Sequence, residues 1–353
     1  KCLKMSTHTP IQFEACWAIT NIASGTLEQT AYIVHTGVLK DLSFLVNSEN
    51  QALKEQALWA LGNIAGDVQF RDAVLRLPVI EPTILACMPT AQISLQRTAS
   101  WVLSNFVRVH NQAGHEEKHT VPKAELVRPI WRHAMRAIAT NGWLTDEMVV
   151  SDLMFTLYYC ATNYSEARGA ILSSKPLVDK ILDPNVLNPS DGVSRHGASN
   201  ASSAKIVSAL TVDPVAASRL VEMSLVPKLG SVLGNNMVPV KKESKLFLLK
   251  TTRNISALKD PHGTLNASVI SAGLHPFLLT EFRMALATKN QKNLTCTLEA
   301  VSNFIGNADL KTGVSQWVEN GAIVVLVDGL DWKSCGIELC AKVAKTGIRI
   351  LKA

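Results

Sequence analysis

An internal repeat of 42 residues is the feature of this chain that most constrains its fold. Three segments align without a gap, and each places a tryptophan four residues before an asparagine: 14–21, 56–63 and 98–105. The tryptophans Trp17, Trp59 and Trp101 stand 42 residues apart, and so do Asn21, Asn63 and Asn105. Self-similarity at a period of roughly 20–50 residues indicates an array of units that each pack only on their neighbours.

The residues between the tryptophan segments predict three helices per repeat. Apolar residues recur at helical spacing in 27–35, 39–46 and 51–65, and each stretch ends at a stop signal, such as Gly37 or Gly66. Three helices in roughly forty residues is the armadillo pattern, whereas HEAT repeats have two. We therefore predict an all-α fold, a right-handed superhelical armadillo solenoid of three-helix repeats.

The repeat continues in a weaker form towards the C-terminus. We expect further long helices at 153–163, 198–210, 244–255, 296–305 and 339–351, and loops or insertions around 111–121 and 183–197. Tyr159 and Asn163 keep an aromatic–asparagine pair, and Asn254 and Asn303 keep the asparagine, but Lys250 stands where a tryptophan is expected. We expect one armadillo domain over 1–353 with about eight to nine repeats, well matched over 11–110 and divergent over 111–353.

Composition argues against several other classes of protein. Apolar residues make up 47% of the chain, but none of the apolar runs approaches the roughly 18 residues that cross a bilayer, so no membrane association is expected. The seven cysteines are scattered without a Cys-x-x-Cys pair, which favours a reducing compartment. The net charge of +6 arises entirely after residue 110, but no Lys/Arg block alternates with aromatic residues, so direct nucleic-acid binding is not expected.

The spacing of tryptophan and asparagine predicts a binding groove. Residues four apart share one helix face, so Gln56, Trp59 and Asn63 lie together, apart from Leu58 and Leu61. An asparagine amide can pair with the backbone of an extended ligand. Neighbouring indoles form slots for the stems of lysine or arginine and attract the cation, by roughly 0.5–2 kcal/mol each. Stacked repeats would align these side chains along one concave wall.

These segments resemble the importin-α (karyopherin-α) family. Residues 10–26 (PIQFEACWAITNIASGT) look like its second armadillo repeat, and residues 55–67 (EQALWALGNIAGD) followed by 70–72 (FRD) look like its third. The match is specific over about 10–108 and patchy beyond. The resemblance implies an adaptor for nuclear import that binds basic nuclear-localisation signals and moves between cytoplasm and nucleus. Importin-β and the export receptor of importin-α would be its protein partners, and no cofactor is implied.

The resemblance also implies a major signal-binding site on the second to fourth repeats. Asp67 matches the aspartate that pairs with the key lysine of the signal. The full set of residues that the resemblance assigns to this site is Trp17, Asn21, Gly25, Thr30, Gln56, Trp59, Asn63, Asp67, Trp101 and Asn105. Weaker contacts in later repeats would come from Tyr159, Asn163, Asn254 and Asn303.

Two departures from the family pattern carry expectations. The second, minor site of the family needs further Trp–Asn pairs, and Lys250 would repel a basic ligand there, so we expect this site to be weak or absent. The basic segment that recruits importin-β in this family does not precede the repeats here, so we expect that partner to bind through a segment missing from this chain.

Two other classes of function remain to be weighed. His110, His115 and His119 lie in one polar stretch and could hold a metal, but loop histidines without cysteines are usually solvated, and neither a phosphate-binding loop nor a nucleophile elbow is present, so no metal site and no enzyme is predicted. The alternative is an armadillo scaffold of the β-catenin kind, whose lysine-lined groove binds extended acidic partners. The basic later repeats suit that alternative, whereas Asp67 and the Trp–Asn pairs favour a cationic ligand.

Overall fold

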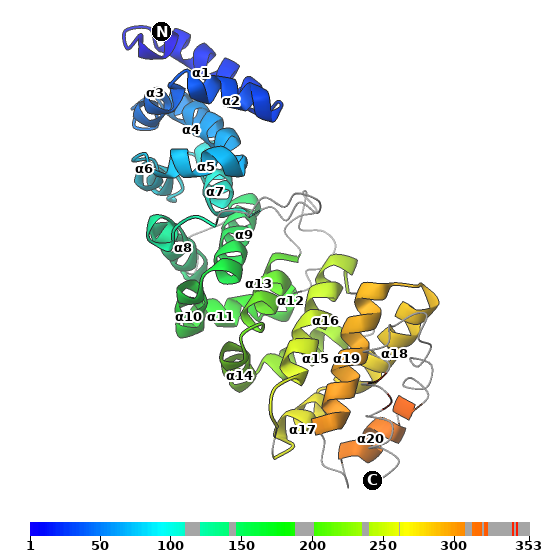
Figure 1. Ribbon diagram of the computed structural model, residues 1–353. Helices are drawn as coiled ribbons and strands as arrows, with labels where there is room; N and C mark the ends of the chain where they lie inside the picture. Colours follow the sequence, from blue (N-terminus) through cyan, green and yellow to red (C-terminus); the bar gives the residue numbers. More distant parts are fainter. Residues whose placement is uncertain are drawn as a thin grey trace. The chain divides into compact units, whose positions relative to one another are not determined.

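The computed structural model describes residues 1–109, 121–140, 146–187, 201–234, 240–260, 262–307, 313–319 and 321–323, with residues 341 and 344. This described part is built of helices and contains no strand, which confirms the predicted all-α armadillo fold (Figure 1). The chain divides into two compact units, Lys1–Leu177 and Val178–Ala353, which we call unit 1 and unit 2.

Unit 1 contains the repeats with the best sequence match. Its helices are η1 (Cys2–Lys4), α1 (Thr9–Ala23), α2 (Leu27–His35), α3 (Val38–Leu45), α4 (Gln51–Gly66), α5 (Val68–Leu75), α6 (Ile80–Ala86), α7 (Ile93–Val107), α8 (Ala124–Ala139), α9 (Glu147–Asn163) and α10 (Ser165–Ser173), followed by α11 (Lys175–Ile181) at the boundary. The three helices predicted for one repeat are α2, α3 and α4, each within one residue of the expected bounds. Helices α5, α6 and α7 repeat the same order.

Two layers organise unit 1. The long helices α1, α4, α7 and α9 pack one on the next and form what we call the long-helix layer. Helices α3, α6 and α8 pack behind α4, α7 and α9 respectively, and α6 also contacts α8 (Figure 1). We call them the shorter-helix layer after α3 and α6, although α8 has 16 residues. Helices α4 and α7 therefore each have one side against the shorter-helix layer and two sides against neighbouring long helices, which leaves one side for solvent.

The apolar residues that the sequence placed away from the Trp59 face are buried in α4. Leu58, Leu61 and Ile64 are fully buried, and Ala65 is 1% exposed. Burying such side chains contributes roughly 1.5–3 kcal/mol each for the large aliphatic ones. The Trp59 side of the helix is thereby separated from the core side, as the helical spacing predicted.

Local capping explains where the helices of unit 1 begin. Thr26 and Gln29 form a capping box at the start of α2, in which each side chain pairs with the backbone of the other. The side chain of Asn50 accepts from the N–H of Leu53 at the start of α4. Gly37 separates α2 from α3 with φ of 79°, a left-handed conformation that glycine adopts without a steric penalty. These caps keep consecutive helices short and sharply joined.

Unit 2 repeats this plan with different side chains. Its helices are α12 (Pro184–Leu187), α13 (Ser202–Leu210), α14 (Pro214–Glu222), α15 (Leu225–Leu233), α16 (Lys242–Ser256), α17 (Thr264–Ser271), α18 (Leu274–Ala287), α19 (Gln291–Asn307) and α20 (Gly313–Glu319). The long helices α13, α16 and α19 pack in series, as α4 and α7 do in unit 1. At the junction between α14 and α15 the left-handed residue is Ser224, with φ of 67°.

The weaker downstream predictions have mixed outcomes. Helices were expected at 153–163, 244–255 and 296–305, and these ranges lie within α9, α16 and α19. The expected loop at 183–197 is wrong at its start, because residues 184–187 form α12 with Pro184 at the first position, where proline is favoured. The rest of that loop, residues 111–120 and most of the expected helix at 339–351 lie outside the described residues.

Two negative findings apply to the described residues alone. In that part of the chain, none of the helices has both the length and the apolar character that crossing a bilayer requires. The same residues contain no cluster of three or more side chains able to hold a metal ion. His110, His115 and His119, the metal ligands considered above, lie outside the described residues.

Candidate functional site

The three tryptophans of the repeat lie on successive members of the long-helix layer. Trp17 is on α1, Trp59 on α4 and Trp101 on α7. Trp17 is 53% exposed and Trp59 is 47% exposed, whereas Trp101 is only partly exposed. Large aromatic side chains are usually well buried. Two adjacent helices of the layer therefore present indole surface to solvent, and these indoles are not part of the core.

The asparagines of the repeat connect each long helix to the one before it. Nδ2 of Asn63 donates to the backbone carbonyl of Thr20 at 3.0 Å, and Nδ2 of Asn105 donates to that of Gly62 at 3.2 Å. Both bonds join residues 43 apart in sequence. We call this bond the asparagine clasp. The clasp uses one N–H of the amide, so a ligand could pair only with the second N–H and the amide oxygen.

The three asparagines differ in exposure. Asn21 is exposed, Asn63 is partly exposed and Asn105 is 3% exposed. Oδ1 of Asn105 is buried and has no hydrogen-bond partner among the described residues. The sequence predicted that all three asparagines line one binding wall, but of the three only Asn21 is exposed. Burial of Asn105 follows from its position against α4, where it also faces Gly66.

Gly62 provides the space in which Trp101 lies. A Cβ atom at Gly62 would be 2.5 Å from Cζ3 of Trp101 and 2.8 Å from Cγ2 of Val102. These are distances that real Cβ contacts do not reach, so the indole lies directly against the backbone of α4. This packing explains why Trp101 is less exposed than Trp17 or Trp59. Sequence reasoning missed Gly62, although a mid-helix glycine is a signal of close approach.

Three of the residues assigned through the resemblance serve the packing around α1 and α2. Gln56 is 7% exposed and donates Nε2 to Oγ1 of Thr20 at 2.9 Å. Thr30 is 3% exposed and donates its hydroxyl to the carbonyl of Thr26 at 3.2 Å. Gly25 is exposed, and a Cβ there would be 1.9 Å from Oε1 of Gln29 in the capping box. Thr30 and Gln56 therefore hold the helices in place and present little surface of their own.

Asp67 joins α4 to α5 at the end of the Trp59 face. It follows Trp59 and Asn63 at the same four-residue spacing, so it continues their line along the helix. Its side chain is partly exposed and accepts from the N–H of Gln69 at 3.0 Å as the N-cap of α5. Among the described residues it forms no ion pair. A carboxylate with one oxygen engaged in capping can still accept hydrogen bonds from a cation.

Helices α7 and α9 are joined by an ion pair and a hydroxyl–carboxylate hydrogen bond, where the earlier pairs of long helices have the asparagine clasp. Nη2 of Arg97 lies 2.6 Å from Oδ2 of Asp146, and this hydrogen bond lowers the pKa of Asp146. The hydroxyl of Ser100 donates to Asp152 at 3.0 Å, and burial raises the pKa of Asp152 to about 6. Sequence reasoning missed Asp152, whose signal is a carboxylate in the middle of an otherwise apolar helix.

Tyr159 and Asn163 on α9 do not form a clasp. Nδ2 of Asn163 donates to the carbonyl of Tyr159 in its own helix at 2.7 Å. The hydroxyl of Tyr159 accepts from Nε of Arg108 at 3.3 Å. The aromatic–asparagine spacing persists here, but a guanidinium already occupies one side of the tyrosine.

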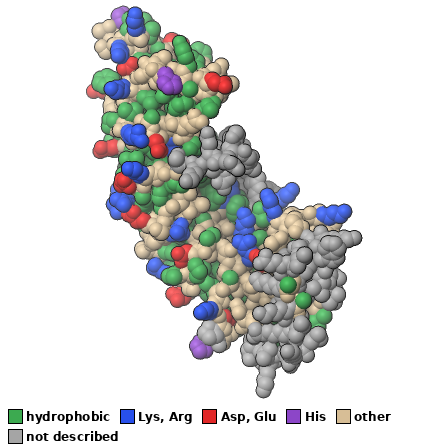
Figure 2. Space-filling view, in the orientation of Figure 1, with side chains coloured by type: hydrophobic (Ala, Val, Ile, Leu, Met, Phe, Trp, Pro, Cys, Tyr) green, Lys and Arg blue, Asp and Glu red, His purple; other side chains and the backbone are tan. Residues whose placement is uncertain are grey.

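In unit 2 the asparagines of the repeat bond to side-chain hydroxyls in or directly after the preceding long helix in place of backbone carbonyls, so the clasp itself is not repeated there. Nδ2 of Asn254 donates to Oγ1 of Thr211 at 3.3 Å, and Nδ2 of Asn303 donates to Oγ of Ser256 at 3.0 Å. At the tryptophan position of α16, Nζ of Lys250 lies 4.9 Å from the ring centroid of Phe247. Lys205 of α13 also places its Nζ 5.6 Å from that centroid. At the tryptophan position of α19 stands Glu299, whose Oε2 lies 3.7 Å from Nε of Arg253. Cations therefore outnumber carboxylates at these positions, and Figure 2 shows several Lys and Arg side chains on the described surface of unit 2.

Comparison with known proteins identifies relatives of the chain. A family model described as Armadillo/beta-catenin-like repeat matches residues 1–24 and 26–66. Importin subunit alpha-1b of Oryza sativa subsp. japonica is 34% identical over 187 residues, which are 52% of this chain and 33% of that protein. Importin subunit alpha-1a of the same species is 31% identical over 268 residues, 74% of this chain and 46% of that protein. Importin subunit alpha-2 of Caenorhabditis elegans is 41% identical over 144 residues, 38% of this chain and 27% of that protein.

The alignments cover only part of each relative, and the chain spans less than half the length of these curated proteins. Among solved structures, a crystal structure of an engineered protein matches with a TM-score of 0.57 at 19% identity, covering 72% of this chain and 93% of that one. This likeness concerns the fold alone.

Proposed function

The chain is a divergent armadillo-repeat member of the importin-α family, and on that premise we propose that it is a nuclear-import adaptor that binds lysine- and arginine-rich localisation signals along its long-helix layer. The observation that carries the proposal is the pair of half-exposed indoles, Trp17 and Trp59, on helices that pack directly against each other. Packed helices lie about 8–10 Å apart, so the slot between two such indoles suits the methylene stem of one basic side chain.

The electrostatics of the Trp59 face support a cationic ligand. An indole face attracts an ammonium or guanidinium by roughly 0.5–2 kcal/mol, with the larger values in desolvated sites. Asp67 lies at the end of this face with no ion pair among the described residues. A lysine whose stem lies between the indoles would place its ammonium at this carboxylate, and an acidic ligand would be repelled there.

The asparagines supply the backbone contacts in this proposal. Asn21, whose amide is exposed, and Asn63, with one N–H used in the clasp, can pair with the main chain of an extended peptide. Such pairing is independent of the ligand's side chains, so it sets the path of the peptide while the indoles and Asp67 select its charge. Trp101 and Asn105 would close the site at its third helix.

We propose a single signal-binding site, in unit 1. In unit 2 the cations of Lys205 and Lys250 lie over Phe247, where the family's second site would need an indole, and they would repel a basic peptide. The remaining parts of the proposal rest on the importin-α family alone: partners that include importin-β and the export receptor of importin-α, movement between cytoplasm and nucleus, and a role without catalysis.

A direct binding comparison tests the proposal. The purified chain is titrated with a fluorescent lysine-rich peptide and with a glutamate-rich peptide of the same length, and fluorescence anisotropy reports the affinity of each. We expect the lysine-rich peptide to bind with one equivalent per chain, and the glutamate-rich peptide not to bind at this face. Trp59→Ala and Asp67→Lys should each weaken binding of the basic peptide by about tenfold or more, since each removes an attraction of about 1.4 kcal/mol or more.

A matched variant controls for damage to the fold. Phe44 on α3 is 75% exposed and lies on the shorter-helix layer, so Phe44→Ala should leave the affinity for the basic peptide unchanged. Basic-peptide binding that is insensitive to both Trp59→Ala and Asp67→Lys would show that the long-helix layer is not the site.

A further inference from the structure

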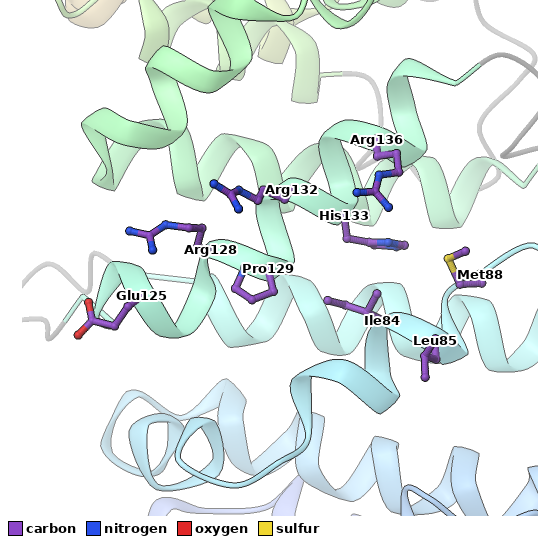
Figure 3. A pocket seen from close by; sticks show the side chains of 9 residues that line it. All are labelled: Ile84, Leu85, Met88, Glu125, Arg128, Pro129, Arg132, His133 and Arg136. Atoms are coloured by element: carbon purple, nitrogen blue, oxygen red, sulfur yellow. The ribbon is translucent and has the colours of Figure 1, made fainter.

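A pocket of unit 1 lies on the shorter-helix layer. It opens between α6 and α8 and has a volume of about 510 Å³. Ile84 and Met88 lie on the α6 side and Pro129 on the α8 side, so its floor is apolar (Figure 3). Leu85, which also lines it, is 61% exposed. Helices α6 and α8 pack behind α7 and α9, so this pocket is separate from the exposed tryptophans of the long-helix layer.

Three arginines line the same pocket from α8. Arg128, Arg132 and Arg136 are spaced four residues apart, which places them along one side of the helix (Figure 3). Arg128 is engaged by Glu166 through two hydrogen bonds, of 2.7 and 2.8 Å. Arg132 and Arg136 are exposed, and neither forms an ion pair with a described residue. Two guanidinium groups at the rim are thus available to an anion.

The carboxylates near the pocket offset only part of this charge. Glu166 pairs with Arg128 and also interacts electrostatically with Arg132. Glu125 lines the far end of the pocket, on the side of Arg128 (Figure 3). Burial, with a smaller effect of Arg136, lowers the pKa of His133 to about 4, so its imidazole is neutral near pH 7. The end of the pocket at Arg132 and Arg136 is therefore positive across the physiological pH range, next to an exposed leucine.

This combination of groups limits the chemistry of an occupant. Exposed apolar surface inside a concave site favours an apolar side chain of a ligand. Guanidinium groups favour carboxylates or phosphates, with which they form paired hydrogen bonds. A nucleic-acid backbone would satisfy the arginines but would leave Leu85, Ile84 and Met88 without a partner. An acidic peptide that carries a large apolar residue satisfies both.

We propose that the pocket between α6 and α8 is a docking site for an acidic, leucine- or phenylalanine-containing segment of a partner protein. One apolar side chain of that segment lies on Leu85 and Met88, and carboxylates on either side of it pair with Arg132 and Arg136. The proposal goes beyond the binding of basic signals, because it concerns the opposite charge and a different layer of helices. The chain would then hold two peptides of opposite charge at once.

A peptide titration of the full chain tests this site. The probe is a short fluorescein-labelled peptide of aspartate and glutamate with a central leucine, and anisotropy is read with and without saturating lysine-rich peptide. We expect the acidic peptide to bind equally in both conditions. Arg132→Glu with Arg136→Glu should weaken it by about a hundredfold, since two charge-assisted contacts are reversed, and Leu85→Ser by about tenfold.

Controls separate this proposal from the function proposed above. Arg76, an exposed arginine beyond the end of α5, does not line the pocket, so Arg76→Glu should bind the acidic peptide as the wild type does. Trp59→Ala should weaken binding of the basic peptide by about tenfold or more and leave the affinity for the acidic peptide unchanged. A double arginine variant that keeps wild-type affinity for the acidic peptide overturns the proposal. So does a short single-stranded RNA that binds more tightly than the peptide and is lost in the same variant, because it would assign these arginines to nucleic acid.

Discussion

The side-chain amide of Asn105 donates a hydrogen bond to the backbone carbonyl of Gly62, 43 residues earlier on the preceding long helix. Asn63 makes the same bond to Thr20 across the same separation. The clasp thus recurs with the period of the sequence repeat, and it explains in structural terms why asparagine recurs in these segments. An amide in this position contributes to stability before any ligand is present.

We predict that the clasp and the exposed amide can be separated by mutation. Asn63→Ala removes the bond to Thr20 and should lower the free energy of unfolding by about 1 kcal/mol, the usual net worth of such a bond. Asn21→Ala alters an exposed side chain and should change it by less than about 0.5 kcal/mol. Urea unfolding followed by circular dichroism measures both. Equal stability of the two variants would mean that the clasp adds nothing.

We predict that Gly62→Ala destabilises the chain, although alanine is normally the better helix residue. The added methyl group would overlap the indole of Trp101 at 2.5 Å, and relieving that overlap in a packed site costs about 1–3 kcal/mol. The matched control is Gly66→Ala in the same helix, where the nearest atom is Nδ2 of Asn105 at 3.9 Å and the change should be neutral or slightly stabilising. Thermal unfolding compares the two, and the tryptophan fluorescence of Gly62→Ala should shift as the indole of Trp101 moves.

Much of unit 1 could be predicted from the sequence because its repeats obey helical periodicity. The bounds of α2, α3 and α4 follow from apolar spacing and from the stops at Gly37 and Gly66. The exposure of Trp59 follows from its lying on a different face of α4 from Leu58 and Leu61, and Trp17 holds the same position of the repeat on α1. Both results depend on local spacing, which a sequence carries directly.

The burial of two predicted site residues could not be predicted from the sequence, because it depends on contacts between repeats. The burial of Asn105 and Gln56 results from bonds to residues 43 and 36 positions away, and a helical pattern does not specify which atoms meet at such distances. The three arginines of α8 were overlooked for a different reason. A search for contiguous basic runs misses charges that lie four residues apart and come together only on a helix.

We predict a pH dependence of stability that originates at Asp152. Burial raises its pKa from 3.8 to about 6, so the folded chain holds this proton more tightly than the unfolded chain does. The contribution of Asp152 to stability is therefore lost as the pH rises from about 4 to about 6 and then levels off, with a change of about 3 kcal/mol. Asp152→Asn should remove this decline, so that the variant equals the wild type near pH 4 and exceeds it near pH 7.

The difference in unfolding free energy between the wild type and Asp152→Asn isolates the contribution of Asp152 from that of the other carboxylates. Asp146, whose pKa is lowered by Arg97, gives a slope of opposite sign, and it is present in both proteins. Urea unfolding at a series of pH values between these limits provides the measurement. Parallel curves for the wild type and Asp152→Asn would contradict the prediction.

We predict that Ser224→Gly stabilises unit 2. Ser224 has φ of 67°, a left-handed conformation that costs a residue with a Cβ roughly 1–2 kcal/mol, whereas glycine adopts it freely. The loss of a side chain makes the unfolded state more flexible, so we expect a net gain of about 0.5–1 kcal/mol. The reciprocal change is Gly37→Ala, at φ of 79°, which should destabilise unit 1. Differential scanning calorimetry reads both shifts.

The fit of Trp101 against Gly62 has a consequence for natural variation. A bulky indole and a bare backbone at these two places are acceptable only together, because either one without the other leaves a clash or an unfilled gap. We expect related sequences that keep an aromatic ring at position 101 to retain glycine at position 62. Related sequences without an aromatic ring at position 101 should accept alanine or serine at position 62, so the two positions should covary.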